Sequence, residues 1–422
     1  MKSLPAADTS QSPSRPPSSA LQVLLAFLKL GLTSFGGPIA HLGYFRHQFV
    51  ERRRWLDDAE FAELVALCQF LPGPASSQVG IAIGLKRAGP LGALAAWLGF
   101  TLPSALLMAG FAQNFAGADE LLHAPWVHGL LIAAVAVVAQ AVWSMGRQFC
   151  AGRMPLAIAL IAAFTCTLAG NGLTQLLVLA AAAAAGWLLL PITDDLRPRL
   201  PGEATEAAAD APAAAAASRR GAIAALLVFA GLLIGLPIAA SMTANHALAL
   251  ADRFFRTGSL VFGGGHVVLP LLQAQVVPPG WISNQSFLAG YAAAQAVPGP
   301  LFTFAGYLGA AMGPAPNGWP GAALCLLAIF LPSFLLVFGV MPFWSTLRQG
   351  AEVRSALRGV NAAVVGVLLS ALYQPVFVSA IHTSADFAVA LAGFLLLLLG
   401  RLPSWSVLLL CTGYALVRAA AG

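Results

Sequence analysis

Apolar runs of about 20 residues recur along almost the whole chain, and they constrain its fold more than any other feature. Because an α-helix rises 1.5 Å per residue, about 20 residues cross the roughly 30 Å core of a bilayer. Only 9% of the 422 residues are charged and 59% are hydrophobic, whereas a soluble domain carries about a quarter charged residues. Such a chain cannot cover a water-facing surface. We therefore predict an all-α polytopic integral membrane protein.

A polar interruption divides the hydrophobic segments into two groups. We predict a disordered N-terminal tail over residues 1–20, a first membrane repeat over 21–190, a polar linker over 191–220, a connecting transmembrane helix over 221–243 and a second membrane repeat over 244–422. The tail lacks the basic-then-apolar pattern of a cleaved signal peptide. The linker is rich in alanine, proline and charged residues, a composition typical of a connection between domains.

Four ordered sequence blocks occur twice, which indicates an internal duplication. The block Gly31-x-x-x-Phe35-Gly36-Gly37 returns 227 residues later as Gly258-x-x-x-Phe262-Gly263-Gly264. Three more pairs follow in the same order with slowly drifting offsets: Pro72-Gly73-Pro74 with Pro298-Gly299-Pro300, Leu102-Pro103-Ser104 with Leu331-Pro332-Ser333, and Gly129 with Gly359. Self-similarity of this kind predicts two homologous halves.

The distribution of charge predicts that the two halves are inverted relative to each other. Arginines at 52–54 and the pair Lys86-Arg87 flank the second segment of the first half, while the equivalent loops of the second half, Val276–Asn284 and Gly313–Trp319, carry no charge. Lysine and arginine concentrate on the cytoplasmic side of membrane proteins. Equivalent loops should therefore lie on opposite sides, with the N-terminus inside and the C-terminus outside. The connecting helix supplies the additional crossing.

Helix breakers interrupt four of the apolar segments at matching positions in the two halves. If the first two segments each crossed the membrane, the arginines at 52–54 would lie outside, against the positive-inside rule. If both segments are re-entrant, these arginines lie inside together with Lys86. Proline and glycine end a helix, and unwound backbone must be buried or line a cavity. We therefore predict broken or re-entrant helices. Matched breaks in inverted halves are typical of a transport site, where the N-terminus of a restarting helix suits an anion. Packing kinks are the alternative interpretation.

Few polar side chains lie near these breaks. Lys29 and Arg256 occupy equivalent positions two residues before the first glycine of each repeat, and we predict that they are anion ligands; snorkelling to the membrane interface is the alternative. Gln69 and Gln295 also match, each three residues before a Pro-Gly-Pro. Their amides either donate to an oxyanion or bond across helices.

The duplicated Phe-Gly-Gly-Pro, Leu-Pro-Gly-Pro and Leu-Pro-Ser blocks resemble the chromate ion transporter superfamily in its long, two-domain form. The resemblance covers nearly the whole chain apart from the tail and the linker. It implies a multi-pass secondary transporter of a bacterial inner membrane that exports chromate and confers chromate resistance, with sulfate as the structural analogue. The substrate-binding positions that it implies are the motif residues Phe35, Gly36, Gly37, Pro38, Pro72, Gly73, Pro74, Phe262, Gly263, Gly264, Pro298, Gly299 and Pro300. In the second copy Gly265 replaces the proline of the first motif, which predicts a more flexible break.

The sequence lacks the motifs of common enzymes and of ATP-driven pumps. The sequence contains no Walker motif, no HExxH and no Ser/His/Asp set, so we predict neither an enzyme nor an ATP-driven pump. The five cysteines show no metal-binding spacing, and we predict no cofactor and no metal. The expected partners are an oxyanion and the lipid bilayer, without nucleic acid; a homodimer is left open. The first alternative is a permease for sulfate or another divalent oxyanion, because residue types alone do not separate chromate from sulfate. The second alternative is a membrane-embedded enzyme.

Overall fold

The structure, a computed structural model, describes residues 19–35, 37–115, 124–169, 172–190, 219–262, 267–347, 350–399, 402 and 404–421. These residues form helices and loops and no strands. The first half contains α1 (Ala20–Thr33), α2 (Gly37–Phe45), η1 (Arg46–Arg52), α3 (Asp58–Phe70), α4 (Ala75–Phe115), α6 (Pro125–Phe149), α7 (Arg153–Leu168) and α8 (Gly172–Leu189). After α9 (Arg219–Met242), the second half contains α10 (His246–Leu260), α11 (Val268–Val276), α12 (Asn284–Ala296), η5 (Leu301–Thr303), α13 (Phe304–Ala311), α14 (Gly318–Val340), η6 (Met341–Phe343), α15 (Trp344–Leu347), α16 (Ala351–Ala371), η7 (Leu372–Phe377), α17 (Val378–Ala380), α18 (Ser384–Leu399) and α19 (Ser404–Ala421).

Several of these helices have the length and composition of membrane spans, as the apolar runs predict. Within the described ranges, five helical stretches are long and apolar enough to cross a bilayer: Ala75–Asn114, Pro125–Phe149, Arg219–Met242, Gly318–Leu347 and Glu352–Ala380. Shorter apolar helices of 10–17 residues accompany them, including α1 and α18. The prediction of an all-α multi-pass membrane protein is confirmed.

Each broken segment of the first half folds back on itself. The ring centroids of Phe27 in α1 and Phe49 in η1 lie 4.8 Å apart, although a straight helix would separate residues 22 positions apart by about 33 Å. The next break behaves in the same way, since Lys86 Nζ in α4 lies 3.0 Å from Glu60 Oε1 at the start of α3. Both segments are therefore helical hairpins that enter and leave on one side, which confirms the prediction of re-entrant helices.

The bases of these two hairpins share one basic face. The guanidinium carbons of Arg53 and Arg87 lie 5.1 Å and 5.5 Å from the centroid of the Trp55 ring. This contact places the arginines that follow η1 beside the Lys86-Arg87 pair. Because both clusters lie together, the positive-inside rule is satisfied without conflict. We call the side of the molecule that carries Arg53, Lys86 and Arg87 the basic face.

The second half repeats the same pair of hairpins. The first is closed at its base by the rings of His246 in α10 and Trp281 after α11, whose centroids lie 4.4 Å apart. In the second, the Tyr307 hydroxyl of α13 donates to the Ser286 carbonyl oxygen of α12 over 2.9 Å. The backbone N–H of Gly313 then donates to the Trp281 carbonyl oxygen over 3.1 Å, so the two bases lie side by side.

The long helix α4 shows that the two sets of bases lie on opposite faces. Its backbone is non-helical at Ala88 and Gly89, directly after the basic face, and its second part then continues to Phe115 as a helix long enough to span a bilayer. Near the far end, the ring centroid of Phe111 lies 5.8 Å from that of Tyr307. One helix therefore runs from the hairpin bases of the first half to those of the second. The repeats are inverted, as the charge pattern predicts, and we call the second side the opposite face.

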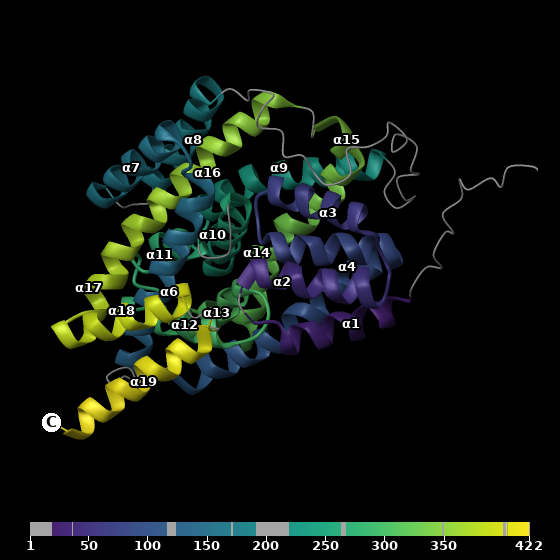
Figure 1. Cartoon of the computed structure of the whole chain (residues 1–422). Coiled ribbons are helices and arrows are strands. Elements are labelled where there is room, and N and C mark those ends of the chain that lie inside the picture. The colour runs from purple at the N-terminus through teal and green to yellow at the C-terminus, as the bar shows by residue number, and fades with distance from the viewer. Residues whose placement is uncertain are drawn as a thin grey trace, which may run out of the picture.

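The remaining helices are exchanged between the halves. Helix α6 of the first half packs against α18 and α19 of the second, and α16 of the second packs against α7 and α8 of the first. In Figure 1, α7 and α8 lie beside α16 on one flank, while α1 to α4 lie on the other. Equivalent glycines make both contacts: a Cβ on Gly129 would meet Thr412 Cα at 2.5 Å, and one on Gly359 would meet Ala182 O at 2.0 Å. Small residues at such crossings allow helices to approach closely in lipid.

Helix α9 covers α10 and α14 from the outside and connects the two halves. In its most apolar 18-residue stretch only 6% of the residues are buried, as expected for a helix that faces lipid on most sides. It begins at Arg219, so the last two residues of the predicted linker are helical instead, and residues 191–218 lie outside the described ranges. The predicted N-terminal tail lies outside them up to residue 18; Ser19 caps α1.

Candidate functional site

The four helix breaks form the tips of the four hairpins. The first tip follows α1 at Ser34 and Phe35, and α2 restarts at Gly37 with a backbone φ of +77°. The Pro-Gly-Pro tips contain Gly73 with φ +124° and Gly299 with φ +103°. These are left-handed values that glycine adopts far more readily than other residues. The sequence therefore breaks each helix where the chain must reverse.

Backbone hydrogen bonds join the tips of one half to the tips of the other. The Gly73 N–H donates to the Val261 carbonyl oxygen over 2.7 Å, and the Gly299 N–H donates to the Ser34 carbonyl oxygen over 2.9 Å. Gly73 is the repeat equivalent of Gly299, and Ser34 is that of Val261. The two bonds are thus related by the inverted repeat. Because the hairpins enter from opposite faces, this is the level at which the halves meet inside the membrane.

The Leu-Pro-Ser motif of each half packs on the Pro-Gly-Pro tip of the other. A Cβ on Gly73 would lie 3.0 Å from Ser333 Oγ of α14, and a Cβ on Gly299 would lie 2.8 Å from Ser104 Oγ of α4. Proline at position 103 or 332 is tolerated inside a transmembrane helix because neighbouring groups satisfy the freed backbone. Both motif serines are fully buried. The duplicated blocks that are far apart in the sequence therefore form one interface.

A cluster of buried polar side chains surrounds the tips. The Gln78 amide donates to the Pro72 carbonyl oxygen over 2.6 Å, and the His41 Nδ1 lies 3.4 Å from Ser76 Oγ. The His41 ring also meets Phe100 edge-on at 5.2 Å. These contacts connect the start of α4 to α2 and to the middle of α4. The cluster is continuous with both tip-to-tip hydrogen bonds.

Several polar atoms on the tip segments and on the helices packed against them are buried and have no hydrogen-bond partner among the described residues. They are the hydroxyl oxygens of Ser34, Ser77, Thr101 and Ser333, together with His41 Nε2 and Gln78 Oε1. A buried polar group without a partner costs about 1–3 kcal/mol. Four hydroxyl groups can donate to a ligand, whereas the Gln78 oxygen can only accept. No Asp, Glu, Lys or Arg stands in the described parts of the tips, residues 34–35, 37–38, 71–76, 261–262 and 297–301. These tip segments are therefore rich in donors and carry no formal charge.

The two predicted cations lie outside this cluster. Lys29 is exposed on α1, on the same helix face as Leu25 and Leu32, which are each 55% exposed. Arg256 donates to Asp252 Oδ1 of its own helix over 2.6 Å, and Asp252 is buried. In the part of the chain that the structure describes, neither cation hydrogen-bonds to a tip residue. Asp252 lies one helical turn from Arg256 and neutralises its charge.

The other predicted site residues divide into three groups. Pro74 and Pro300 are buried at the tips, whereas Phe35, Pro38, Pro72, Phe262 and Pro298 are half-buried. Gln69 is exposed, while Gln295 is half-buried and its Nε2 atom has no partner among the described side chains. Gly36, Gly263 and Gly264 lie outside the described residues. The hydroxyl groups were not predicted as ligands, although Ser104 and Ser333 stand in a duplicated motif that could have indicated them.

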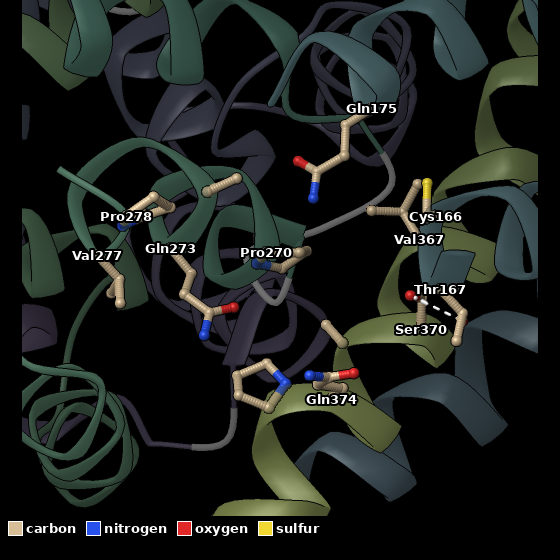
Figure 2. Close-up of a pocket in the computed structure, with 13 residues that line it drawn as sticks. Cys166, Thr167, Gln175, Pro270, Gln273, Val277, Pro278, Val367, Ser370 and Gln374 are labelled. Carbon is tan, nitrogen blue, oxygen red and sulfur yellow. Dashed lines mark hydrogen bonds between the residues drawn. The ribbon is translucent and has the colours of Figure 1, made fainter. Parts of the chain in front are cut away.

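A separate cavity lies away from the tips, between α7, α8, α11, α16 and η7 (Figure 2). Its volume is about 350 Å³, and its polar lining consists of Thr167, Gln175, Gln273, Ser370 and Gln374. Thr167 donates to Ser370 over 3.0 Å. None of the lining residues is charged, and none belongs to a hairpin tip. This cavity lies between the re-entrant helix α11 and the exchanged helix bundle.

Comparisons with known proteins identify related chains. A model of the chromate transporter family matches residues 21–187 and 248–416. A chromate transport protein of Pseudomonas aeruginosa is 29% identical over 366 residues, which cover 84% of this chain and 80% of the relative. A probable chromate transport protein of Synechococcus elongatus is 28% identical, with 85% and 84% covered. An uncharacterized transporter of Methanocaldococcus jannaschii is 26% identical, with 83% of each chain covered. No solved structure matches significantly.

Proposed function

Because the chain belongs to the chromate transporter family, we propose that it is a secondary transporter that exports chromate through a site at the four hairpin tips. The observation that carries this proposal is the meeting of the tips, where two inverted hairpin pairs enclose buried hydroxyl donors. Sites of this kind, at the interface of inverted repeats, bind the cargo in many secondary transporters. The relatives named chromate transport proteins support the choice of chromate.

The chemistry of the tips suits a small oxyanion. Chromate offers four oxygen acceptors, and the Ser34, Ser77, Thr101 and Ser333 hydroxyls can each donate one hydrogen bond. Helices α2 and α4 restart at Gly37 and Ala75, and their free N–H groups add positive dipole ends at the same level. Hydrogen bonds to a charged acceptor contribute about 1.5–3 kcal/mol each. This contribution is net of the hydrogen bonds to water that the anion gives up.

Alternating access follows from the inversion of the hairpins. The first-half hairpins enter from the basic face and the second-half hairpins from the opposite face, and their tips are joined by two backbone hydrogen bonds. Movement of one hairpin pair against the other would open the site to one face and close it to the other. The described arrangement, with the donors buried, corresponds to the closed intermediate between these two states.

The membrane potential supplies enough energy for export. Moving one charge across 100 mV corresponds to about 2.3 kcal/mol, so a dianion leaving a negative interior gains about 4.6 kcal/mol. This corresponds to a concentration ratio of roughly a thousandfold or more. Export of chromate is therefore downhill by voltage alone and requires no ATP. Uptake of sulfate by the same site would need an additional coupling ion.

Flux measurements in inside-out vesicles test this proposal. Chromate and sulfate are supplied outside the vesicles, which corresponds to the cytoplasm, and the voltage and pH gradients are imposed separately. We expect chromate to accumulate with an interior-positive voltage and sulfate to accumulate more slowly. Faster sulfate than chromate flux, or flux that requires a pH gradient and ignores voltage, would overturn voltage-driven chromate export.

A further inference from the structure

A second cavity lies on the opposite face, among the ends of helices from both halves. Its volume is about 450 Å³, and its polar lining consists of His128, Asn284, Gln285, Ser379 and His382. His128 stands near the start of α6 and Asn284 at the start of α12, close to the hairpin bases of the second half. None of its lining residues belongs to the hairpin tips. The transport site described above does not use these side chains.

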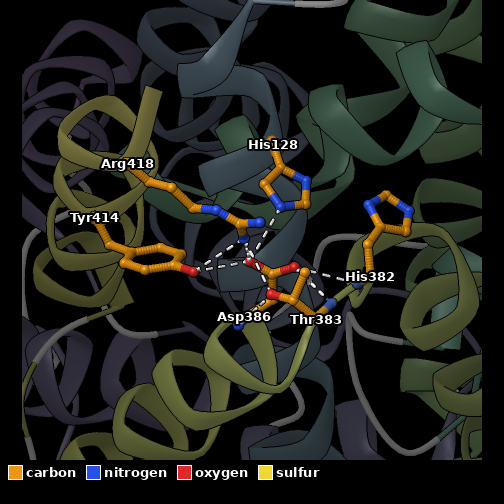
Figure 3. A network of polar contacts seen from close by, with 6 residues as sticks. All are labelled: His128, His382, Thr383, Asp386, Tyr414 and Arg418. Atoms are coloured by element: carbon orange, nitrogen blue, oxygen red, sulfur yellow. Dashed lines mark hydrogen bonds and ion pairs between the residues drawn. The ribbon is translucent and has the colours of Figure 1, made fainter. Parts of the chain in front are cut away.

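A buried carboxylate orders one wall of this cavity (Figure 3). Asp386 Oδ2 accepts hydrogen bonds from the backbone N–H groups of His382 at 3.2 Å and Thr383 at 2.9 Å. Asp386 Oδ1 accepts from the Tyr414 hydroxyl at 3.0 Å and from Arg418 Nη1 at 2.9 Å, and His128 Nε2 lies 3.4 Å from the same oxygen. Both oxygens are therefore in use, and Arg418 compensates the charge of Asp386.

This arrangement disfavours a metal ion, although a ligand atom of His128, one of His382 and one of Asp386 lie within 4.8 Å of one another. A cation at this point would face the Arg418 guanidinium, which already shares Oδ1. A carboxylate with four hydrogen bonds and an arginine partner is a structural anchor for its neighbours. The His382 imidazole and the Nδ1 atom of His128, whose Nε2 faces Asp386, are the groups that remain available to the cavity.

The two imidazoles lie parallel and close together. Their ring centroids are 5.3 Å apart and the ring planes differ by 10°. Histidine is the side chain that changes charge between pH 5 and 8. Among the described residues, the charged or titratable groups that face the pair are Asp386 and Arg418, which compensate each other, and Tyr414. The walls from α12 and α17 contribute neutral Asn284, Gln285 and Ser379. Protonation of both rings would therefore give this cavity two positive charges.

A chain of hydrogen bonds fixes the neutral wall of the cavity. Gln273 Nε2 donates to Asn284 Oδ1 over 2.8 Å, and Asn284 Nδ2 donates to Ser379 Oγ over 2.9 Å. Because the Ser379 oxygen accepts this bond, its own hydroxyl proton is free to donate into the cavity. Gln273 also lines the first cavity. These hydrogen bonds therefore fix the walls of the two cavities relative to each other.

We propose that His128 and His382 form a proton-dependent oxyanion-binding vestibule on the opposite face, through which the transported anion passes. The proposal rests on the proposed transport function and adds a second site to it. Two protonated imidazoles repel each other. An oxyanion bound by both rings and by the Ser379 hydroxyl relieves that repulsion, whether it carries one negative charge or two. Binding of protons and binding of the anion then favour each other, because linkage between two sites is reciprocal. On this face, acid strengthens anion binding and neutral pH releases the anion.

The test compares the wild-type chain with the double variant His128→Gln, His382→Gln and with His382→Gln alone. Chromate binding to the purified full-length protein and chromate flux in proteoliposomes are measured at pH 5.5 and at pH 8.0, with the same pH on both sides. Chromate itself takes up a proton in this range, so each variant is compared with wild type at the same pH. His382 is exposed and its ring packs on His128, so its replacement removes little buried surface. His47→Gln is the matched control, because His47 lies on η1 near the basic face and pairs with Glu51.

At pH 5.5 we expect the double variant to bind chromate at least about tenfold more weakly than wild type, and His382→Gln to show part of that loss. At pH 8.0 both variants should match wild type within about twofold, and His47→Gln should match it at both values. An equal loss at both pH values, or no loss at either, would overturn the vestibule while leaving the transport function intact. Absence of wild-type flux and binding at both pH values would overturn the transport function and the vestibule with it.

Discussion

At the scale of single residues, the proposed site is built from hydroxyl groups at the hairpin tips. The charge pattern of the sequence instead predicts a site at Lys29 and Arg256. Ser34, Ser77 and Ser333 are buried without a hydrogen-bond partner among the described residues, while the cations Lys29 and Arg256 point elsewhere or are neutralised. A sequence shows which side chains carry charge. It does not show which polar atoms lack a partner after folding, because that depends on contacts between segments more than 200 residues apart.

Removal of the Ser333 hydroxyl should weaken substrate binding without weakening the fold. Ser333→Ala breaks no hydrogen bond among the described residues, so we expect Tm to be unchanged or slightly raised. The dissociation constant for chromate should rise about tenfold, which corresponds to about 1.4 kcal/mol. Equilibrium dialysis and thermal unfolding of the purified protein measure the two effects. Ser144→Ala is the control, because the Ser144 hydroxyl bonds its own helix at the Ala141 carbonyl oxygen; a similar loss of affinity there, or none at Ser333, would contradict the assignment.

The two cations should behave differently from each other. Arg256→Gln leaves Asp252 buried without its partner, and we expect a loss of about 1–3 kcal/mol in stability, seen as a lower Tm. Lys29→Gln changes an exposed side chain and should leave Tm unchanged. Both variants should keep chromate affinity within about threefold of wild type where they fold. A tenfold loss of chromate affinity in Lys29→Gln at unchanged Tm would instead show that Lys29 takes part in chromate binding.

At the scale of elements, the tips depend on glycines that no other residue can replace. Gly73→Ala places a Cβ at φ +124°, 3.0 Å from Ser333 Oγ and 2.6 Å from Gln78 Nε2. Backbone strain of this kind costs about 1–3 kcal/mol, so we expect a lower Tm and nearly complete loss of chromate flux. Gly43→Ala in α2 is the control, since nothing lies within 4 Å of its Cβ position. Normal flux in Gly73→Ala would show that the tip is not part of the transport path.

The elements also show how far sequence reasoning extends. The breaks, the duplication and the inversion could be predicted, because glycine, proline and positive charge each act locally or through a general rule. The exchange of α6 and α16 between the halves could not be predicted. Gly129 and Gly359 indicate close helix contacts, but the sequence does not indicate which helix each of them contacts. The same limit applies to Ser104 and Ser333, whose motif was visible in the sequence while its partner tip in the other half was not.

At the scale of the whole molecule, the two inverted halves form one interlocked body. Each half contributes two hairpins to the shared interface, and each gives one long helix, α6 or α16, to the bundle of the other half. The tips are therefore supported from both sides of the membrane. The central claim of this account is that chromate binds where the four tips meet, between Gly73 and Gly299, and not at Lys29 or Arg256.

Anomalous diffraction at the chromium absorption edge, from crystals of the full-length protein with chromate, tests this claim most directly. The account predicts a chromium peak among the hairpin tips, with chromate oxygens about 2.7–3.0 Å from the Ser34, Ser77 or Ser333 hydroxyls. A further peak beside His128 and His382 at pH 5.5 would agree with the vestibule. Chromium bound at Lys29 or in the cavities alone, with none among the tips, would contradict the account.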